Sequence, residues 1–335
     1  MKHANISIFI PHLGCPFKCS FCAQNEISHT ERVPSPDEVK DIIASAFERI
    51  SPEDRVKTEI AFFGGSFTAI ERDYMTALLD IACGYTISSR DDGFRGIRVS
   101  TRPDCIDDEI LGLLKKYGVT AIELGAQSMD DEILTANYRG HTSEDVRRSA
   151  ALIKSYGFEM GLQMMTGLYR SSPEKNMATG ESIAELSPDT VRIYPTVIIK
   201  KIALGRLFEQ GKYIPYPFDE CISVCAKLVR LFEGKGIRII RLGLHAERSL
   251  EENMLGGFYH PSMGELVRSR IIRDRIEQET GDTGGHEVRC GKRMISMVTG
   301  NKGANREYFG GRVRIKADMT LPDDMIMCDG RELAL

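Results

Sequence analysis

The feature that most limits how this chain can fold is a regular alternation of two kinds of segment. Short apolar runs rich in β-branched residues, typical of strands, alternate with amphipathic stretches that carry apolar residues at helical spacing. The expected strands are 6–11, 58–65, 96–101, 121–128, 161–167, 190–198 and 238–244, and expected helices between them include 34–50, 107–118, 143–157 and 219–236. Several of these helices open with Ser, Asp or Pro and close on Gly, as capped helices do.

At least six strand-then-helix units at near-regular spacing predict an α/β fold with parallel strands and right-handed crossovers. The natural closure of such units is a barrel or part-barrel, whose active site collects at the carboxyl ends of the strands. Chemically informative segments should therefore stand at those ends. The first expected strand runs into a loop that contains three cysteines. The ends of the next five carry, in chain order, the motifs FFGGSFT, STRPD, ELGAQS, TGLY and RIYPT, and Gln163 lies within the fifth strand.

The loop after the first strand, PHLGCPFKCSFCAQ, holds Cys15, Cys19 and Cys22 at the spacing C-x3-C-x2-C, and no fourth cysteine lies within sixty residues of Cys22. Three thiolates from one loop can hold three irons of a [4Fe–4S] cube. The fourth iron then keeps an open coordination position, as catalytic metal sites do. Two alternatives remain open: a zinc site completed by a distant ligand such as His12 or Cys105, and a redox pair formed by Cys19 and Cys22.

Composition narrows the classes of protein that fit. With 44 Lys or Arg against 48 Asp or Glu, the net charge is −4, so any basic surface that attracts nucleic acid must be local. The amino terminus has too short an apolar run for a signal peptide, and no eighteen consecutive residues are apolar, so we expect a cytoplasmic protein without a membrane partner. Nine cysteines, mostly far apart, do not resemble the framework of a small secreted fold.

The pattern changes after about residue 250. The stretch 260–280 predicts one basic helix, 281–311 is glycine-rich and basic, and 312–319 predicts a strand. From Gly264 to Lys316 there are 12 Lys or Arg against 7 Asp or Glu, a local excess of five positive charges. This segment fits either an RNA-binding surface or an ordinary solvated face.

We therefore expect two domains: a barrel over 1–250, and a short basic extension over 251–335 that packs on it. Within the extension, His286 and Cys290, with Cys328 further on, could bind a metal. The sequence favours a chance pair over a metal site, because no second close pair of ligands accompanies them.

The strand-end motifs resemble a known superfamily. A C-x3-C-x2-C loop after the first strand, Phe21 before its last cysteine, and Gly64 and Gly65 at the end of the second strand resemble the radical S-adenosylmethionine (SAM) enzymes. Between residues 96 and 217, the runs STRPD, GVTAIELGAQS, RGHTSEDVRRSAALIKSYGF, GLQMMTGL and RIYPTVII resemble the radical SAM domain of the Elongator catalytic subunit. The oxygen-independent coproporphyrinogen oxidases share the skeleton more loosely. The resemblance covers about residues 5–262.

The resemblance implies a partial TIM-type (β/α)6 barrel with a [4Fe–4S] cluster on Cys15, Cys19 and Cys22 and with SAM as cofactor. It implies cofactor-binding roles for eight residues: Gly64, Gly65, Ser66, Glu123, Gln127, Ser128, Lys154 and Gln163. It implies catalytic roles for Lys154, Gln163 and Tyr194. Internal pairing of Glu123, a solvated helix position for Lys154, and loop capping by Gln127 and Ser128 remain as structural alternatives.

The resemblance further implies an enzyme that reductively cleaves SAM with an external one-electron donor and modifies RNA, specifically a tRNA uridine. The RNA would be held by the basic extension. The residues after about 262 are too few for the acetyltransferase-like domain of Elongator-type enzymes, so we expect none. The competing hypotheses are a radical SAM enzyme that acts on a small molecule, such as a tetrapyrrole, and a non-enzymatic iron–sulfur or zinc module.

Overall fold

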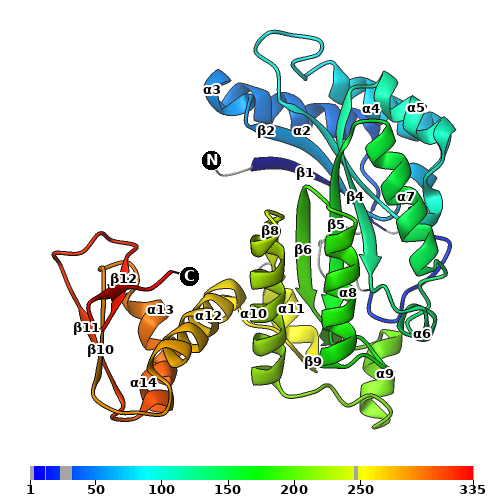
Figure 1. The fold of residues 1–335 in the computed structure, drawn as a ribbon. Coiled ribbons are helices and arrows are strands. Elements are labelled where there is room, and N and C mark those ends of the chain that lie inside the picture. The colour runs from blue at the N-terminus through cyan, green and yellow to red at the C-terminus, as the bar shows by residue number, and fades with distance from the viewer. Residues whose placement is uncertain (1–3, 12, 23–31, 245–247, 335) are drawn as a thin grey trace.

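The computed structural model describes residues 4–11, 13–22, 32–244 and 248–334, and its largest element is one curved sheet of seven strands (Figure 1). The strand order β1-β2-β3-β4-β5-β6-β8 follows the chain, and every neighbouring pair is parallel. The strands are β1 (Ala4–Ile10), β2 (Thr58–Gly64), β3 (Gly96–Thr101), β4 (Val119–Gln127), β5 (Glu159–Thr166), β6 (Thr190–Pro195) and β8 (Arg238–Leu242). The predicted α/β part-barrel is confirmed.

Helices cover the convex face of this sheet (Figure 1). The helices of the barrel are α2 (Pro36–Arg49), α3 (Pro52–Arg55), α4 (Arg72–Cys83), α5 (Asp108–Lys116), α6 (Asp131–Ala136), α7 (Ser143–Ser155), α8 (Pro173–Glu185), α9 (Ala203–Glu209), α10 (Phe218–Gly234) and α11 (Arg248–Asn253). Two short 3₁₀ turns, Phe67–Ala69 and Pro103–Cys105, follow β2 and β3. Most boundaries follow local sequence signals, such as the Ser35 capping box with Pro36 at the start of α2.

The two faces of the sheet differ in chemistry because side chains alternate along each strand. In β4, Ile122, Leu124 and Ala126 are buried in the apolar core beneath the helices. Glu123 and Gln127, at the intervening positions, belong to the opposite, concave face, where Glu123 binds partners from neighbouring strands. The concave face is therefore polar, and the loops at the carboxyl ends of the strands border it.

One predicted strand, 190–198, is divided in the structure. β6 ends at Pro195, which has no N–H to extend the ladder, and β7 (Val197–Ile199) pairs antiparallel with β9 (Met254–Gly257). This two-stranded ribbon follows the carboxyl end of β6.

The carboxyl-terminal part forms a second sheet in the order β11-β10-β12-β13. Its elements are α12 (Met263–Thr280), β10 (His286–Cys290), α13 (Ile295–Thr299), a 3₁₀ turn (Asn301–Gly303), α14 (Ala304–Phe309), β11 (Val313–Ala317), β12 (Ile326–Cys328) and β13 (Arg331–Glu332). The basic helix and the strand predicted there correspond to α12 and β11. This sheet has its own apolar core, and α12 also packs on α10, with ion pairs from Arg268 to Glu233 and from Arg270 to Asp219.

None of the described helices combines the length and the apolar content that a membrane span requires.

Candidate active site

A cavity of about 460 Å³ lies at the carboxyl ends of strands β2 to β5. It is lined by Cys15, Phe17, Lys18, Cys19, Phe21, Cys22, Gly64, Gly65, Ser100, Thr101, Arg102, Gly125, Gln127, Arg139 and Gln163. The structure thus brings together seven of the predicted cluster- and cofactor-binding residues, from four separate strand ends: the three cysteines of the loop, Gly64, Gly65, Gln127 and Gln163. This is the position at which α/β barrels carry their active sites.

The cysteine loop is attached to the end of β2 by backbone contacts that only glycine allows. The N–H of Gly65 donates to the carbonyl of Ile10 at 2.8 Å, and the N–H of Ser66 donates to the carbonyl of Leu13 at 2.8 Å. A β-carbon on Gly65 would lie 1.9 Å from the Leu13 oxygen, and one on Gly14 would lie 2.2 Å from the Ser66 oxygen. The Gly-Gly pair therefore positions the cysteine loop as well as lining the cavity.

Replacing Gly65 with alanine is expected to displace the cysteine loop and to lower the iron bound after anaerobic reconstitution at least several-fold, because the Leu13 carbonyl belongs to backbone that cannot simply rotate away. Iron and sulfide analysis measures the effect. The matched control is Gly112→Ala in α5, where a β-carbon meets nothing within 4 Å. That helix substitution should leave iron binding unchanged and should stabilise the fold by roughly 0.5–1 kcal/mol.

Two buried arginines place positive charge beside the cysteines. The Arg139 guanidinium donates from Nη1 to Cys19 Sγ at 3.1 Å and from Nη2 to the carbonyl of Gly125 at 2.5 Å. Arg102 pairs with both carboxylate oxygens of Asp104 at 2.9 Å. Burial and the neighbouring Cys19 raise the pKa of the Cys15 thiol, whereas Arg102 and Arg139 oppose that rise. A thiolate at Cys15 therefore gains from a bound cation, and the arginines reduce the cost of gathering several thiolates in one cavity.

The residues of the cavity fit an iron–sulfur cluster with an anionic ligand beside it. Nη1 of Arg102 and Nε of Arg139 are buried and have no hydrogen-bond partner in the part of the chain that the structure describes, so each is a donor available to a ligand. Among the described residues, no three His, Cys, Asp or Glu side chains converge on a single metal ion. Such convergence is needed for a closed zinc site but not for a cubane, in which each thiolate binds a different iron. His12 lies outside the described residues.

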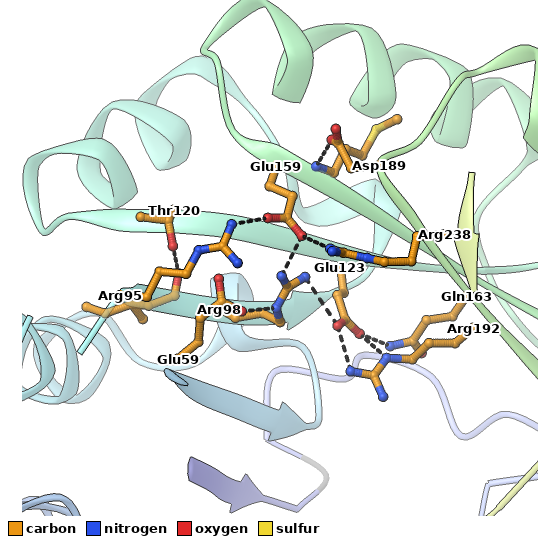
Figure 2. Close-up of polar contacts among 12 residues, drawn as sticks. Glu59, Arg95, Arg98, Thr120, Glu123, Glu159, Gln163, Asp189, Arg192 and Arg238 are labelled. Atoms are coloured by element: carbon orange, nitrogen blue, oxygen red, sulfur yellow. Dashed lines mark hydrogen bonds and ion pairs between the residues drawn. The ribbon is translucent and has the colours of Figure 1, made fainter. Parts of the chain in front are cut away.

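Below the cavity, the concave face of the sheet carries a buried network of charged side chains (Figure 2). Arg98, which is fully buried, donates to Glu59 at 2.7 Å and to Glu159 at 2.7 Å, and it pairs with Glu123 at 3.4 Å. Arg95 and Arg238 add ion pairs to Glu159. These partners come from strands β2 to β5 and β8 or from the segment before β3, so the network ties the interior of the part-barrel together.

Glu123 joins this network to the cavity. Its carboxylate accepts two hydrogen bonds from Arg192, each 2.8 Å long, and one from Nε2 of Gln163, also 2.8 Å long (Figure 2). Because the Gln163 amide donates downward to Glu123, its Oε1 is left to accept from a ligand hydroxyl in the cavity. A β-carbon on Gly161 would lie 3.0 Å from Glu123 Cγ, so this glycine leaves the space that Glu123 occupies. The structure thus gives Glu123 the internal pairing role and gives Gln163 the contact with the cavity.

Tyr194 lies beside the same network and not in the cavity lining. Its hydroxyl interacts electrostatically with the Arg192 guanidinium on the same strand. Burial raises the pKa of the Tyr194 hydroxyl, against the opposing effect of the Arg192 charge, so the phenol stays protonated at neutral pH. Its role in catalysis remains a prediction from the sequence.

Three other predicted residues lie outside the cavity lining. Ser66 is buried behind it, with its hydroxyl 2.8 Å from that of Thr101. Ser128 is also buried and accepts from the N–H of Asp130 at 3.1 Å, which is a loop-capping contact. Lys154 is exposed on α7, because the positions of that helix that face the sheet are Val146, Ser149, Ala150 and Ile153. Lys154 thus lies on the outer helix layer and does not line the cavity, and the cofactor-binding and catalytic roles expected for it remain predictions from the sequence.

Sequence reasoning missed Arg139 and Gly125 and did not foresee the bend at Gln127. Gln127 has a φ of 66°, at a register shift between β4 and β5 that turns its side chain to the cavity. A β-carbon on Gly125 would meet Gln127 Nε2 at 2.9 Å and Arg139 Nη2 at 3.4 Å, so this glycine makes room for both. The available signal was the glycine at a strand end in ELGAQS; nothing local to NYRGHT indicated that Arg139 would reach Cys19.

The contacts of His286, Cys290 and Cys328 do not support a shared metal site, which the sequence had left open. Both ring nitrogens of His286 have partners, Asp329 at 2.6 Å and Thr283 at 2.8 Å, while Cys290 and Cys328 are buried in the second apolar core. Among the described residues these three side chains do not converge on one metal ion.

His141 makes the fold sensitive to acid. Burial, with the charges of Arg139 and Arg102 nearby, lowers the pKa of His141 from 6.5 to about 4. Between pH 6.5 and pH 4, His141 is therefore protonated in the unfolded chain but neutral in the folded chain. The free energy of unfolding consequently falls as the pH drops through this range. We expect the free energy of unfolding to fall by about 2 kcal/mol more in the wild type than in His141→Gln between pH 7 and pH 5. Urea unfolding at both pH values measures this difference; equal losses in the two proteins would contradict the assignment.

The parallel part-barrel, the three-cysteine loop and the glycine-lined cavity at the strand ends together define an enzyme site built to hold a cluster and a second ligand. Family comparison agrees. The radical SAM superfamily matches residues 9–179, and the radical SAM C-terminal domain matches residues 188–273. The chain belongs to the radical SAM superfamily, whose members use a [4Fe–4S] cluster and SAM. It is accordingly an enzyme.

Within this superfamily, the chain is similar to two groups of relatives that share Elongator-type names. The chain is 27% identical to a tRNA uridine(34) acetyltransferase of Dehalococcoides mccartyi (strain CBDB1), over 84% of this chain and 69% of that protein. It is 28% identical to the protein of the same name from Methanocaldococcus jannaschii, over 66% of this chain and 43% of that protein. It is also 28% identical to Elongator complex protein 3 of Homo sapiens, over 64% of this chain and 42% of that protein. The chain thus spans less than half of the latter two relatives, and the predicted Elongator-type resemblance is confirmed.

Solved structures support the fold. Archaeal Elp3 from Methanocaldococcus infernus, with an N-terminal deletion, matches with a TM-score of 0.63 and 21% identity, over 82% of this chain and 64% of that one. Coproporphyrinogen III oxidase (HemN) from Escherichia coli matches with a TM-score of 0.50 and 17% identity, over 70% of this chain and 54% of that one.

Proposed function

We propose that this enzyme reductively cleaves SAM at a [4Fe–4S] cluster and uses the resulting radical to modify RNA, specifically a uridine of tRNA. The observation that carries the proposal is the cavity at the ends of β2 to β5, which Cys15, Cys19 and Cys22 line together with Gly64, Gly65, Gln127 and Gln163. The names of the curated relatives, tRNA uridine(34) acetyltransferase and Elongator complex protein 3, support the choice of substrate. A tRNA substrate agrees with the cytoplasmic location expected from the sequence.

The residues of the chain have distinct tasks in this proposal. When bound, the cluster supplies one electron for the cleavage of SAM to a 5′-deoxyadenosyl radical, which abstracts hydrogen. The three cysteines hold the cluster, and Arg139 compensates negative charge at Cys19. Arg102 and Arg139 offer buried N–H donors to a carboxylate, and Gln163 offers an acceptor to a hydroxyl group. The proposal includes an external one-electron donor that reduces the cluster.

The arginines of α12 offer fewer unpaired charges to RNA than the sequence suggested, because most of them are engaged in ion pairs. Arg268 pairs with Glu233, Arg270 pairs with Asp219 and Asp274, and Arg275 pairs with Glu279. Any RNA contact from the carboxyl-terminal part therefore depends more on the residues that follow α12.

The test is an anaerobic assay of the reconstituted enzyme with SAM and dithionite, in which 5′-deoxyadenosine is measured with and without bulk tRNA. We expect 5′-deoxyadenosine in both cases, a several-fold higher yield with tRNA, and a new nucleoside in digested tRNA by mass spectrometry. Formation of 5′-deoxyadenosine that no RNA changes would retain the radical chemistry and reject the RNA substrate. A complete lack of 5′-deoxyadenosine with an intact cluster would reject the reaction itself.

A further inference from the structure

The carboxyl-terminal sheet contains a compact strand-helix-helix-strand unit that the proposed reaction does not use. β10 leads into α13, the loop Gly300–Gly303 (GNKG) connects α13 to α14, and the chain returns in β11. β10 and β11 are adjacent and parallel, with His286 opposite Val313 and Cys290 opposite Ala317. Val298 of α13 and Phe309 of α14 pack into the same core as these strands, so both helices are anchored to the sheet (Figure 1).

The GNKG loop is fixed at its base and exposed at its tip. Gly300, Lys302 and Gly303 have positive φ angles of 80°, 52° and 84°. A β-carbon on Gly300 would lie 2.7 Å from the backbone nitrogen of Asn305, whose buried side chain donates to the carbonyl of Val298 at 3.1 Å. The tip of the loop has no such close contacts, because Lys302 is exposed and a β-carbon on Gly303 would meet nothing within 4 Å. Another chain can therefore approach the backbone of the loop closely.

The surroundings of the loop carry positive charge. Between residues 292 and 316 there are seven Lys or Arg and a single acidic residue, Glu307. Some of these cations are paired, as Arg293 is with Asp323 and Lys316 with Glu287. Four exposed ones, Lys292, Lys302, Arg306 and Arg314, have no acidic partner within 4 Å in the described ranges. Lys302 lies in the loop itself and Arg306 lies three residues after it, so two of the four unpaired cations stand close to the accessible backbone.

We propose that this unit binds single-stranded RNA through the Gly300–Gly303 loop. The arrangement of two adjacent strands, two helices and a G-x-x-G connection is that of KH modules, whose glycine loop clamps the backbone of about four nucleotides. The local charge complements phosphate, and the open face at Gly303 allows the close approach that such a clamp requires. α13 and α14, with 5 and 6 residues, are too short to fill the major groove of a duplex, which favours a single strand as the occupant.

The site is separate from the cluster cavity, because no residue of the unit lines that cavity and the unit has its own apolar core. The inference therefore does not depend on the proposed reaction. If both hold, the unit would tether the RNA on which the barrel acts.

The experiment measures binding of a fluorescein-labelled, mixed-sequence RNA octamer to the full-length protein by fluorescence anisotropy at 50 and 200 mM salt. We expect Kd to rise with salt and Lys302→Asp to weaken binding about tenfold at 50 mM salt, with a shallower salt dependence. Aspartate tolerates a positive φ, so this variant should fold. Lys302→Asn removes the charge, also suits that backbone angle, and should weaken binding several-fold. The control with the same change of charge is Lys40→Asp on α2, which should change Kd less than twofold.

Equal effects of Lys302→Asp and Lys40→Asp would overturn the assignment, as would failure of the wild type to bind the octamer at 50 mM salt. Equal affinity for an RNA duplex, or for a single-stranded DNA of the same sequence, would overturn the assignment to single-stranded RNA. Preferential capture of an acidic peptide in competition with the octamer would instead identify a protein-binding surface. Formation of 5′-deoxyadenosine without RNA, measured in parallel on Lys302→Asp, should equal that of the wild type, which separates failure of this site from failure of the proposed reaction.

Discussion

Replacing Cys19 with alanine is expected to abolish 5′-deoxyadenosine formation and to remove most of the roughly four irons per chain that a [4Fe–4S] cluster contributes. Cys19 lies in the cavity with Cys15 and Cys22, and its sulfur accepts from Arg139 at 3.1 Å. A cube held by two thiolates would have two unprotected irons, whereas three protein ligands leave only the one position that SAM needs. Iron and sulfide analysis and product chromatography measure the two effects.

The matched control for this experiment is Cys105→Ala. Cys105 is the other cysteine near the cavity, half-buried on the turn after β3, and burial raises the pKa of its thiol. If Cys105 completes a zinc site with the loop cysteines, its removal should cost as much metal as removal of Cys19. We expect instead that Cys105→Ala keeps its iron and its activity. Full activity in Cys19→Ala, or a stoichiometric zinc in the wild type, would reject the cluster.

Replacing Glu123 with alanine is expected to lower the free energy of unfolding by about 3–5 kcal/mol, a large share of the stability of a typical domain. The Glu123 side chain is fully buried, and it neutralises Arg192 through two hydrogen bonds and Arg98 through an ion pair. Its removal leaves parts of two buried guanidinium charges without a counterion. Chemical denaturation followed by circular dichroism measures the loss.

An exposed ion pair supplies the comparison for Glu123. Glu132 pairs with Lys175 at 2.9 Å, but its side chain is 59% exposed. Solvent screens such a pair, so Glu132→Ala should change the free energy of unfolding far less than Glu123→Ala does. A similar small cost for Glu123→Ala would show that the buried network contributes little. In addition, Glu123→Ala should weaken SAM binding relative to Glu132→Ala, because Gln163 loses the partner that orients its amide.

Much of the barrel could be predicted from the sequence because strand and helix periodicities are local. Ile122, Leu124 and Ala126 alternate with Glu123 and Gln127 within a single strand, and this pattern identifies a strand with one apolar face whatever its neighbours. Helix ends were equally local, as in the Ser35 capping box. The glycine-rich stretch 281–311 was different: its strand and two helices are five or six residues long, too short for a period to emerge.

In the candidate site, too, some features could be predicted from local sequence and others could not. Cys15, Cys19 and Cys22 stand within eight residues of one another, and their spacing alone limited the metal chemistry that the loop could support. Arg139 reaches Cys19 from 120 residues away, and Lys154 shares a family motif with cavity residues although its helix turns it to solvent. The contact of Arg139 with Cys19 and the exposure of Lys154 both depend on how distant segments are arranged around the sheet.

The sequence by itself determined the parallel part-barrel and the three-thiolate loop, because strand alternation, helix caps and ligand spacing are set within about ten residues. Only the tertiary structure decided which charges meet: Glu123 binds Arg192, 69 residues away, and Arg98 binds Glu59, 39 residues away. The curvature of the sheet brings these side chains onto one buried face, where each charge requires a partner. The tertiary structure also placed Lys302 and Gly303 at the accessible tip of a loop, which their positions in the sequence did not reveal.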